Sequence, residues 1–235
     1  YKLFPDYPLT QFNSIILRNS GNDWNKTMFR DAFMQSLLNG SKLDIQQYRP
    51  AIVFINGEYW GIHNVRERFD ENYIANKYKL PTDSISILEL SGQLIAGDKG
   101  DERAFAELLQ YVKKNDLSEK WHYDYLVSKM DMQSFTDFII ANVYFCNSDW
   151  PNNNVKFWRY QAKHNKVELA PADGRWSWML YYTDWGFGYN SSSLPTANLL
   201  PKATSTGSVG VLFTGLLKNR EFVNAFLQRF QERSK

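Results

Sequence analysis

The sequence of 235 residues has little cysteine and no long apolar segment. Its single cysteine, Cys146, excludes a disulfide within the chain and a zinc site built from several cysteines. A catalytic thiol would want a histidine partner, and the three histidines are scattered, at His63, His122 and His164. We therefore expect Cys146 to be a buried thiol without a catalytic role. No apolar run approaches the length of a membrane span, so no transmembrane segment is predicted.

The chain also lacks an excess of charge of either sign. It has 27 Lys and Arg against 25 Asp and Glu, with no run of like charges. Nucleic-acid-binding domains usually carry a basic face or stripe, so we expect no nucleic-acid partner. Gly-x-Gly-x-x-Gly, Walker-type, Gly-x-Ser-x-Gly and His-Glu-x-x-His motifs are all missing, which removes most common enzyme classes. A glycosidase needs only two facing carboxylates, and the sequence leaves that class open.

Aromatic residues are plentiful, with 8 Trp, 14 Tyr and 16 Phe. They favour a large packed core, which the hydrophobic fraction of 43% can supply. The alternative is a surface that stacks on sugars or bases.

The first part of the chain predicts strands and two short helices. Its clearest signal is Asn56-Gly57 between apolar runs, which predicts a hairpin with a type I′ turn. The predicted elements are a strand at 14–18, a helix capped by Thr27 and running to Leu38, hairpin strands at 51–55 and 58–65, and a helix capped by Asp70 and running to Tyr78.

The remainder predicts helices around a small sheet. Helical patterns cover 101–115, 118–129, 133–147, 209–218 and 221–233, strand patterns cover 155–160, 166–170 and 178–183, and 190–210 predicts a long loop. This order predicts an α+β fold with an N-terminal sheet region and a mainly helical region that contains a small inserted sheet. We expect one domain over residues 1–235, with lobes 1–95 and 96–235.

The first candidate site lies between a predicted helix and a predicted strand. Asp149 and Asn154 are five positions apart there. Protein kinases use this spacing for a catalytic Asp, which accepts or orients the substrate hydroxyl proton, and for an Asn whose carbonyl holds a divalent ion. Asp and Asn are also common in turns because they bond their own backbone, and the spacing alone favours the turn.

The second candidate site is Asp184-Trp185-Gly186 at the end of a predicted strand. It is similar to the kinase Asp-Phe-Gly motif, whose Asp binds the Mg²⁺ that bridges the nucleotide phosphates. The alternative is a turn with a solvated Asp. Its position after Asp149, with one hairpin between them, follows the order of kinases and favours a kinase.

A third segment, Asn64-Val65-Arg66-Glu67-Arg68-Phe69-Asp70, joins a hairpin strand to a helix. Glu67 there is a candidate to orient a phosphate-binding cation or to help hold metal. The alternative, a surface strand with alternating charges, is favoured without other context.

Together, several segments resemble the spore-coat protein H (CotH) family of atypical secretory kinases. The most specific is Asn56-Gly57-Glu58-Tyr59-Trp60-Gly61. The others are Leu17-Arg18-Asn19 with Asp23-Trp24 and Arg30-Asp31, Asn154 through Tyr160, and Asp184-Trp185-Gly186-Phe187-Gly188. The resemblance runs in order along nearly the whole chain.

The resemblance implies a two-lobed, kinase-like fold and ATP-dependent phosphorylation of Ser or Thr on an exported protein, with Mg or Mn. Asp149 would be the catalytic Asp, and Asn154 and Asp184 would hold the metal. Glu67 would lie at the nucleotide end of the cleft. The resemblance also implies a secreted, periplasmic or cell-surface location.

Two departures from the family pattern keep a second function open. Tyr182 stands where many members have an Asp, which removes a carboxylate from a site that works by charge neutralisation. The chain also starts at Tyr1, so it looks like a fragment without further N-terminal strands that could hold a phosphate-binding Lys. Arg18, Arg30 and Arg66 are the substitutes we consider for that cation. The alternative function is an inactive pseudokinase that serves as an exported binding or surface-attachment module.

Overall fold

The computed structural model describes residues 2–161 and 170–233. Its strands are β1 (Ile15–Arg18), β2 (Asp44–Ile45), β3 (Tyr48–Ile55), β4 (Glu58–Glu67), β5 (Ile85–Glu89), β6 (Gln93–Ala96), β7 (Lys156–Tyr160) and β8 (Ser177–Leu180). Its α-helices are α1 (Arg30–Ser36), α2 (Glu71–Tyr78), α3 (Lys99–Lys114), α4 (Lys120–Val127), α5 (Met132–Tyr144), α6 (Leu200–Ala203), α7 (Gly207–Leu216) and α8 (Arg220–Arg233). The fold is mixed α+β, as the sequence predicts.

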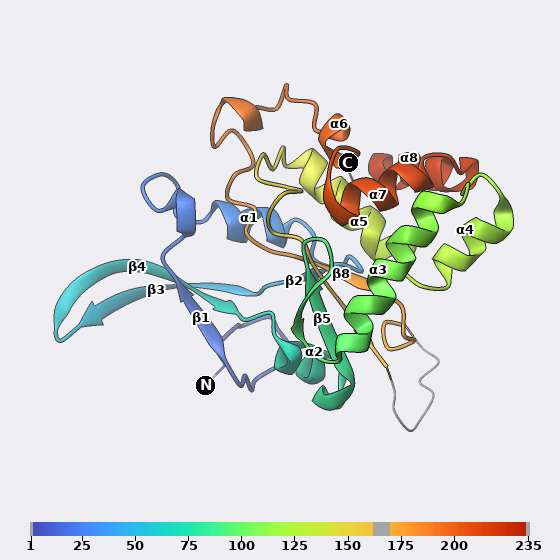
Figure 1. Cartoon of the computed structure of the whole chain (residues 1–235). Helices are drawn as coiled ribbons and strands as arrows, with labels where there is room; N and C mark the ends of the chain where they lie inside the picture. The colour runs from blue at the N-terminus through green and yellow to red at the C-terminus, as the bar shows by residue number, and fades with distance from the viewer. Residues whose placement is uncertain (1, 162–169, 234–235) are drawn as a thin grey trace.

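The first sheet has the strand order β1-β4-β3, and both pairs are antiparallel. Its β3–β4 hairpin confirms the predicted turn, because Asn56 and Gly57 both have positive φ, at 52° and 87°. The tip of this hairpin projects away from the rest of the molecule (Figure 1). The predicted cap of α2 is also confirmed, since the Asp70 side chain accepts a hydrogen bond from the Tyr73 amide.

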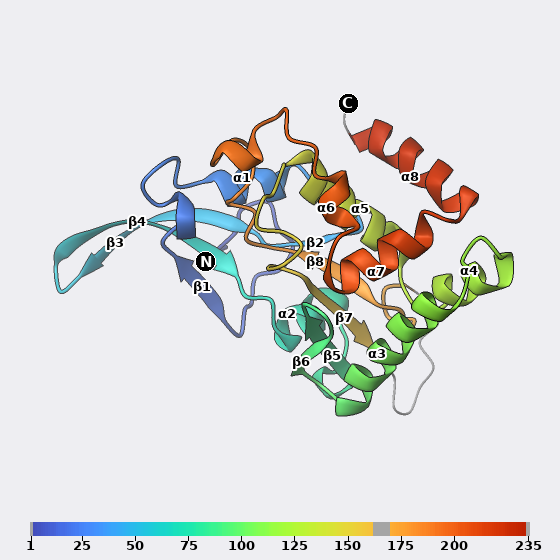
Figure 2. The same cartoon turned by 45° about the horizontal axis from the view of Figure 1, so that its top comes forward.

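The second sheet has the order β2-β8-β7-β5-β6. It joins strands from both sides of residue 95, so the two sheets do not coincide with the expected lobes 1–95 and 96–235. Helices α3, α4, α7 and α8 gather on the side of the molecule away from the hairpin (Figures 1 and 2).

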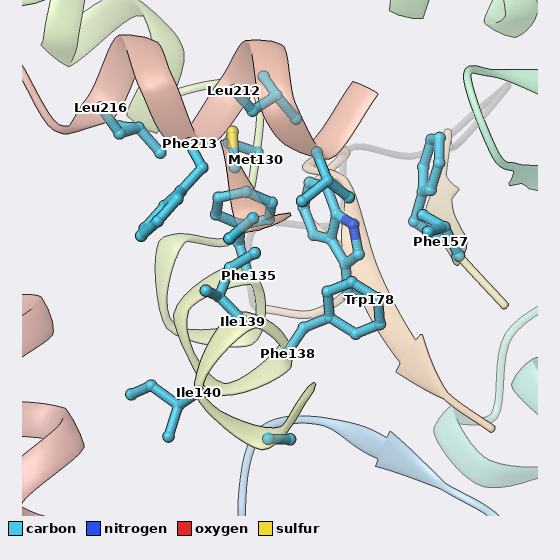
Figure 3. Packing of buried hydrophobic residues seen from close by; sticks show 14 of the residues in the cluster. Met130, Phe135, Phe138, Ile139, Ile140, Phe157, Trp178, Leu212, Phe213 and Leu216 are labelled. Atoms are coloured by element: carbon cyan, nitrogen blue, oxygen red, sulfur yellow. The ribbon is translucent and has the colours of Figure 1, made fainter. Parts of the chain in front are cut away.

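The main core lies around α5, which is buried along most of its length. Figure 3 shows Phe135 and Phe138 of this helix beside Trp178 of β8, with Phe213 of α7 on the other side. The rings of Phe135 and Trp178 have centroids 4.7 Å apart. Four of the eight Trp, at positions 150, 158, 176 and 178, are almost fully buried. Core packing therefore accounts for much of the aromatic content.

Three details of the sequence prediction differ from the structure. Thr27 does not cap α1, because Phe29 is the capping residue and the Thr27 hydroxyl bonds Asp23 instead. The segment 190–210 is not a single loop, since α6 and the start of α7 lie in it. Of the predicted strand 166–170, residues 166–169 lie outside the described residues, and the described neighbours of β7 are β5 and β8.

Cys146 is buried, as expected, and burial raises the pKa of its thiol. The thiol lies 3.5 Å from the Ala197 carbonyl oxygen. Within the described ranges, no helix is both long and apolar enough to cross a membrane.

Candidate functional site

A network of ion pairs connects the first sheet to the segment after β8. Arg18 Nη2 lies 3.0 Å from Asp184 Oδ1, and Arg18 Nη1 lies 3.7 Å from Asp31 Oδ2. Arg66 Nη1 donates to the same Asp31 oxygen at 2.7 Å. Arg18 and Arg66 share one face of the sheet, because Arg66 is opposite Ile16 and side chains alternate along a strand. We call Arg18, Asp31, Arg66 and Asp184 the Arg18 cluster.

Asp31 is held as a carboxylate inside this cluster. Burial by itself would raise its pKa, but Arg66, Arg18 and hydrogen bonds from Thr183 and Gln35 outweigh burial and lower the pKa to about 2. The Thr183 amide and hydroxyl donate to Asp31 Oδ1 at 2.8 and 3.0 Å. These bonds tie α1 to the chain immediately before Asp184.

Asp184 is buried, and both of its oxygens have donors. Oδ1 accepts from Arg18, and Oδ2 accepts from the Asn22 amide at 2.9 Å. The backbone comes this close because Gly21 has no side chain: a Cβ there would collide with the Arg18 guanidinium and would lie 3.0 Å from Asp184 Oδ2. Gly21 also has a φ of 59°, which favours glycine.

Asp149 and Asn154 are brought together, as their spacing suggests. Asn154 Nδ2 donates to Asp149 Oδ2 at 2.9 Å and to the Tyr182 carbonyl oxygen at 3.2 Å. Because the Asn154 amide nitrogen makes both bonds, its carbonyl oxygen is left for other partners. Asn153 Nδ2 donates to Asp149 Oδ1 at 2.8 Å. Through Tyr182 the pair therefore adjoins the Arg18 cluster.

The side chain of Tyr182 lies against a cation. The Arg18 guanidinium is 4.5 Å from the centroid of its ring. Tyr182 has a φ of 53°, which is uncommon for a bulky residue. The Tyr182 ring thus packs on the guanidinium of the Arg18 cluster.

The segment that carries Asp184 is bound to the Asp149 loop through its backbone. The Ser148 amide and hydroxyl donate to the Trp185 carbonyl oxygen at 3.3 and 3.2 Å. Arg30 Nη1 donates to the carbonyl oxygens of Gly186 and Phe187 at 3.2 and 2.6 Å. Among the candidate cations, Arg30 therefore holds this segment in place.

The carboxylate of Glu67 is bonded by a residue outside the Arg18 cluster. It is buried at the end of β4, and its Oε2 accepts from the Gln47 amide at 3.0 Å. Burial raises its pKa to about 7, although the Gln47 hydrogen bond and Lys77 act in the opposite direction. Arg66, the residue before Glu67, is almost fully buried and donates to Asp31, so it positions the Asp31 carboxylate.

A cavity of about 290 Å³ adjoins the Arg18 cluster between the two sheets. Its lining includes Ile16, Arg68, Glu71, Lys156, Tyr181 and Tyr182. Burial lowers the pKa of Lys156, which lies 5.0 Å from the Tyr181 ring centroid. We call this cavity the cleft pocket.

The sequence analysis did not single out Lys156 and Tyr181, which line the cleft pocket. A signal was available for Lys156, because it follows Asn154 by two residues at the start of a predicted strand.

The side chains present suit a divalent ion that arrives with a phosphate ligand. Mg²⁺ is usually held by one or two carboxylates together with substrate phosphates. Asp184 supplies a carboxylate, and Asn154 supplies an amide oxygen that accepts no hydrogen bond from the residues that the structure describes. In the described ranges, no group of three or more His, Cys, Asp or Glu could hold a metal. The arrangement thus fits a metal–phosphate complex better than a free ion.

The sequence model of the family described as CotH kinase protein matches residues 1–235, the whole chain. No curated protein matches the sequence.

Proposed function

We infer that this chain, which belongs to the CotH kinase protein family, binds ATP in the cleft and transfers its terminal phosphoryl group to a hydroxyl group. The observation that carries this proposal is that Arg18 pairs with Asp31 of α1 and with Asp184 beside Asp149 and Asn154. Protein kinases use the same parts: a strand cation paired with a helical carboxylate, a metal-binding Asp, and a catalytic Asp with its Asn.

Asp149 is the residue proposed to act on the nucleophile. The Ser or Thr oxygen would form a bond to the terminal phosphorus while the bond from phosphorus to the leaving ADP oxygen breaks. The hydroxyl proton passes to Asp149, which Asn153 and Asn154 hold in position. The two hydrogen bonds support this role because they orient the Asp149 carboxylate.

Arg18 is the cation proposed to bind the phosphates. Its guanidinium is held by Asp31, Asp184 and the Tyr182 ring, so it is oriented before a ligand arrives. Asp184 and Asn154 would hold the Mg or Mn ion, which, when bound, neutralises phosphate charge. The acceptor proposed from the family resemblance is a protein outside the cytoplasm, at a secreted, periplasmic or cell-surface location.

A second candidate function is an inactive module that binds without transfer. Two observations favour it. Both oxygens of Asp184 already have protein donors, and Tyr182 occupies a position where the family resemblance implies a carboxylate. Fewer carboxylates would weaken metal binding, and transfer depends on charge neutralisation.

Thermal unfolding with ATP, in the presence and absence of Mg²⁺ or Mn²⁺, tests binding. A ligand at a hundred times its dissociation constant stabilises the folded state by about 2.7 kcal/mol. We expect a rise in Tm that needs both nucleotide and metal, and that Asp184→Ala abolishes. Asp124→Ala, which changes an exposed residue of α4, is the matched control. An unchanged rise in Asp184→Ala would contradict the metal-binding role of Asp184.

Asp149→Asn separates transfer from binding. The amide cannot accept the proton, so transfer should fall by about 10²–10⁴-fold while nucleotide affinity is kept. Autophosphorylation and phosphorylation of a Ser- and Thr-containing protein measure transfer. Wild-type protein that binds Mg–ATP without transfer would favour the inactive module, and full transfer by Asp149→Asn would reassign the catalytic role.

A further inference from the structure

Lys156 enters the cleft pocket without a carboxylate partner. It is half-buried, and its ammonium group lies 5.0 Å from the centroid of the Tyr181 ring. Glu89 is its cross-strand neighbour, yet in the described part of the chain no carboxylate oxygen lies within 4.0 Å of the Lys156 ammonium. An ammonium group has three donors and no acceptor. Lys156 therefore has hydrogen-bonding capacity that a ligand in the pocket can use.

The position of Lys156 relative to the Arg18 cluster suggests which part of a ligand it meets. Ile16 and Arg18 lie on the same face of β1, one lining the pocket and the other in the cluster. On the opposite sheet, Lys156 follows Asn154 by two residues. A nucleotide with its phosphates at Arg18 and Asn154 would thus place its base in the cleft pocket, next to Lys156.

The polar lining of the pocket suits a base with several acceptors at one edge. Arg68 and Lys156 are donors there, and Glu71, at the start of α2, is an acceptor. Asp70 also lines the pocket, but its two carboxylate oxygens already accept from the Tyr73 amide and a serine hydroxyl. Guanine presents two acceptors, N7 and O6, and its amino group is a donor at another edge. Adenine presents N7 beside an amino group. A lysine can donate to N7, but it has no acceptor for the amino group. The pairing of a cation with a carboxylate therefore complements guanine.

We propose that Lys156 reads the base edge and that the pocket binds guanine nucleotides at least as tightly as adenine nucleotides. This inference rests on the proposed function, and it widens the phosphoryl donor from ATP to GTP. The Lys156 ammonium donates to O6 or N7 of guanine, while the Glu71 carboxylate accepts from the base amino group. The Tyr181 ring, which already faces the ammonium, keeps the lysine directed into the pocket.

The test is to measure dissociation constants of ADP and GDP with Mg²⁺ by calorimetry and thermal shift, so that no transfer is needed. The wild-type chain is compared with Lys156→Met and Lys156→Arg. Lys129→Met is the matched control, because Lys129 makes a similar contact with Tyr125, at 5.2 Å, on the α4 side of the molecule. Unfolding of each free variant establishes that it is folded.

We expect wild-type protein to bind GDP at least as tightly as ADP. Lys156→Met should weaken GDP about tenfold more than ADP, Lys156→Arg should keep most GDP affinity, and Lys129→Met should behave as wild type. Binding of ADP but not of GDP would overturn the inference and leave the proposed function standing. Equal weakening of both nucleotides by Lys156→Met would also overturn it. Binding of neither nucleotide by wild-type protein would instead remove the proposed function.

Discussion

Two of the buried carboxylate centres, those of Asp44 and of the Arg18 cluster, differ in what lies beside them. Asp44 accepts from Lys77, Tyr73 and Tyr78 at 2.6 to 3.2 Å, and from Trp158 Nε1 at 2.7 Å. All four donors join α2 and β7 to β2. In the Arg18 cluster, by contrast, Arg18 adjoins the cleft pocket through Tyr182.

The contrast shows that burial and ion pairing do not by themselves mark a functional carboxylate. The Asp44 centre lies between strands of one sheet and α2, so its hydrogen bonds stabilise the fold. The Arg18 cluster lies where two sheets meet, next to the hydrogen-bonded pair of Asp149 and Asn154. Its guanidinium is the group proposed to bind the phosphates, whereas Asp44 is not among the residues that line the cleft pocket.

The largest effect should come from the Asp44 centre. Asp44→Ala removes the acceptor of the buried Trp158 indole N–H and of the Tyr78 hydroxyl, and the charge partner of the partly exposed Lys77 ammonium. The Tyr73 hydroxyl keeps a backbone carbonyl oxygen as an acceptor. We expect a loss of about 3–5 kcal/mol in the free energy of unfolding. Denaturant unfolding measures it. Asp44→Asn, which keeps an acceptor, should lose less. A change below about 1 kcal/mol in Asp44→Ala would show that the centre is not needed for the fold.

An intermediate effect should appear as a pH dependence caused by Glu67. Its folded-state pKa is raised from 4.5 to about 7. Between these pH values the folded protein holds a proton that the unfolded chain has lost. The contribution of Glu67 to the free energy of unfolding is therefore highest below about pH 4.5. It falls as the pH rises through 7, by ~3 kcal/mol in total.

Glu67→Gln tests this dependence because the amide does not titrate. Urea unfolding from pH 4.5 to 8 should show a flatter stability profile in the variant than in the wild type. If both proteins lose stability equally over that range, Glu67 is not the responsible group.

The smallest change in stability, and the sharpest change in binding, should follow from Arg18→Met. Asp31 keeps Arg66 and Asp184 keeps the Asn22 amide, so we expect a stability loss of roughly 1–3 kcal/mol. Nucleotide-dependent stabilisation should disappear, and Arg18→Lys should restore part of it. A normal shift with Mg–ATP in Arg18→Met would assign the phosphate-binding role elsewhere.

Local features of the fold were predictable because short-range chemistry decides them. Asn56-Gly57 fixes a hairpin turn through its positive φ angles, and Asp70 caps α2 with its own side chain. The same reasoning predicted Thr27 as the cap of α1, and that prediction was wrong. The Thr27 hydroxyl donates to Asp23, four residues earlier, instead. A residue that satisfies a local rule can be recruited by a nearby partner.

The candidate site was predictable only in part. The spacing of Asp149 and Asn154 suggested a shared loop, and the structure joins them by a hydrogen bond. The role of Arg18 could not be chosen over Arg30 or Arg66 from the sequence, since all three are cations near carboxylates. Three-dimensional contacts separate them. Arg30 donates to backbone carbonyl oxygens, and Arg66 is buried against Asp31. Arg18 bonds Asp184 and lies over the ring of Tyr182, which lines the cleft pocket.

The sequence by itself determined the family resemblance, the α+β class, the hairpin and the loop that carries Asp149 and Asn154. Only the tertiary structure decided that Arg18 meets Asp184 across 166 residues, and that Lys156 lines a pocket beside them. The physical reason is one of range. Turns and caps depend on neighbouring residues, whereas a buried charge is stabilised by whichever partner the packing of two distant strands brings within a few ångströms.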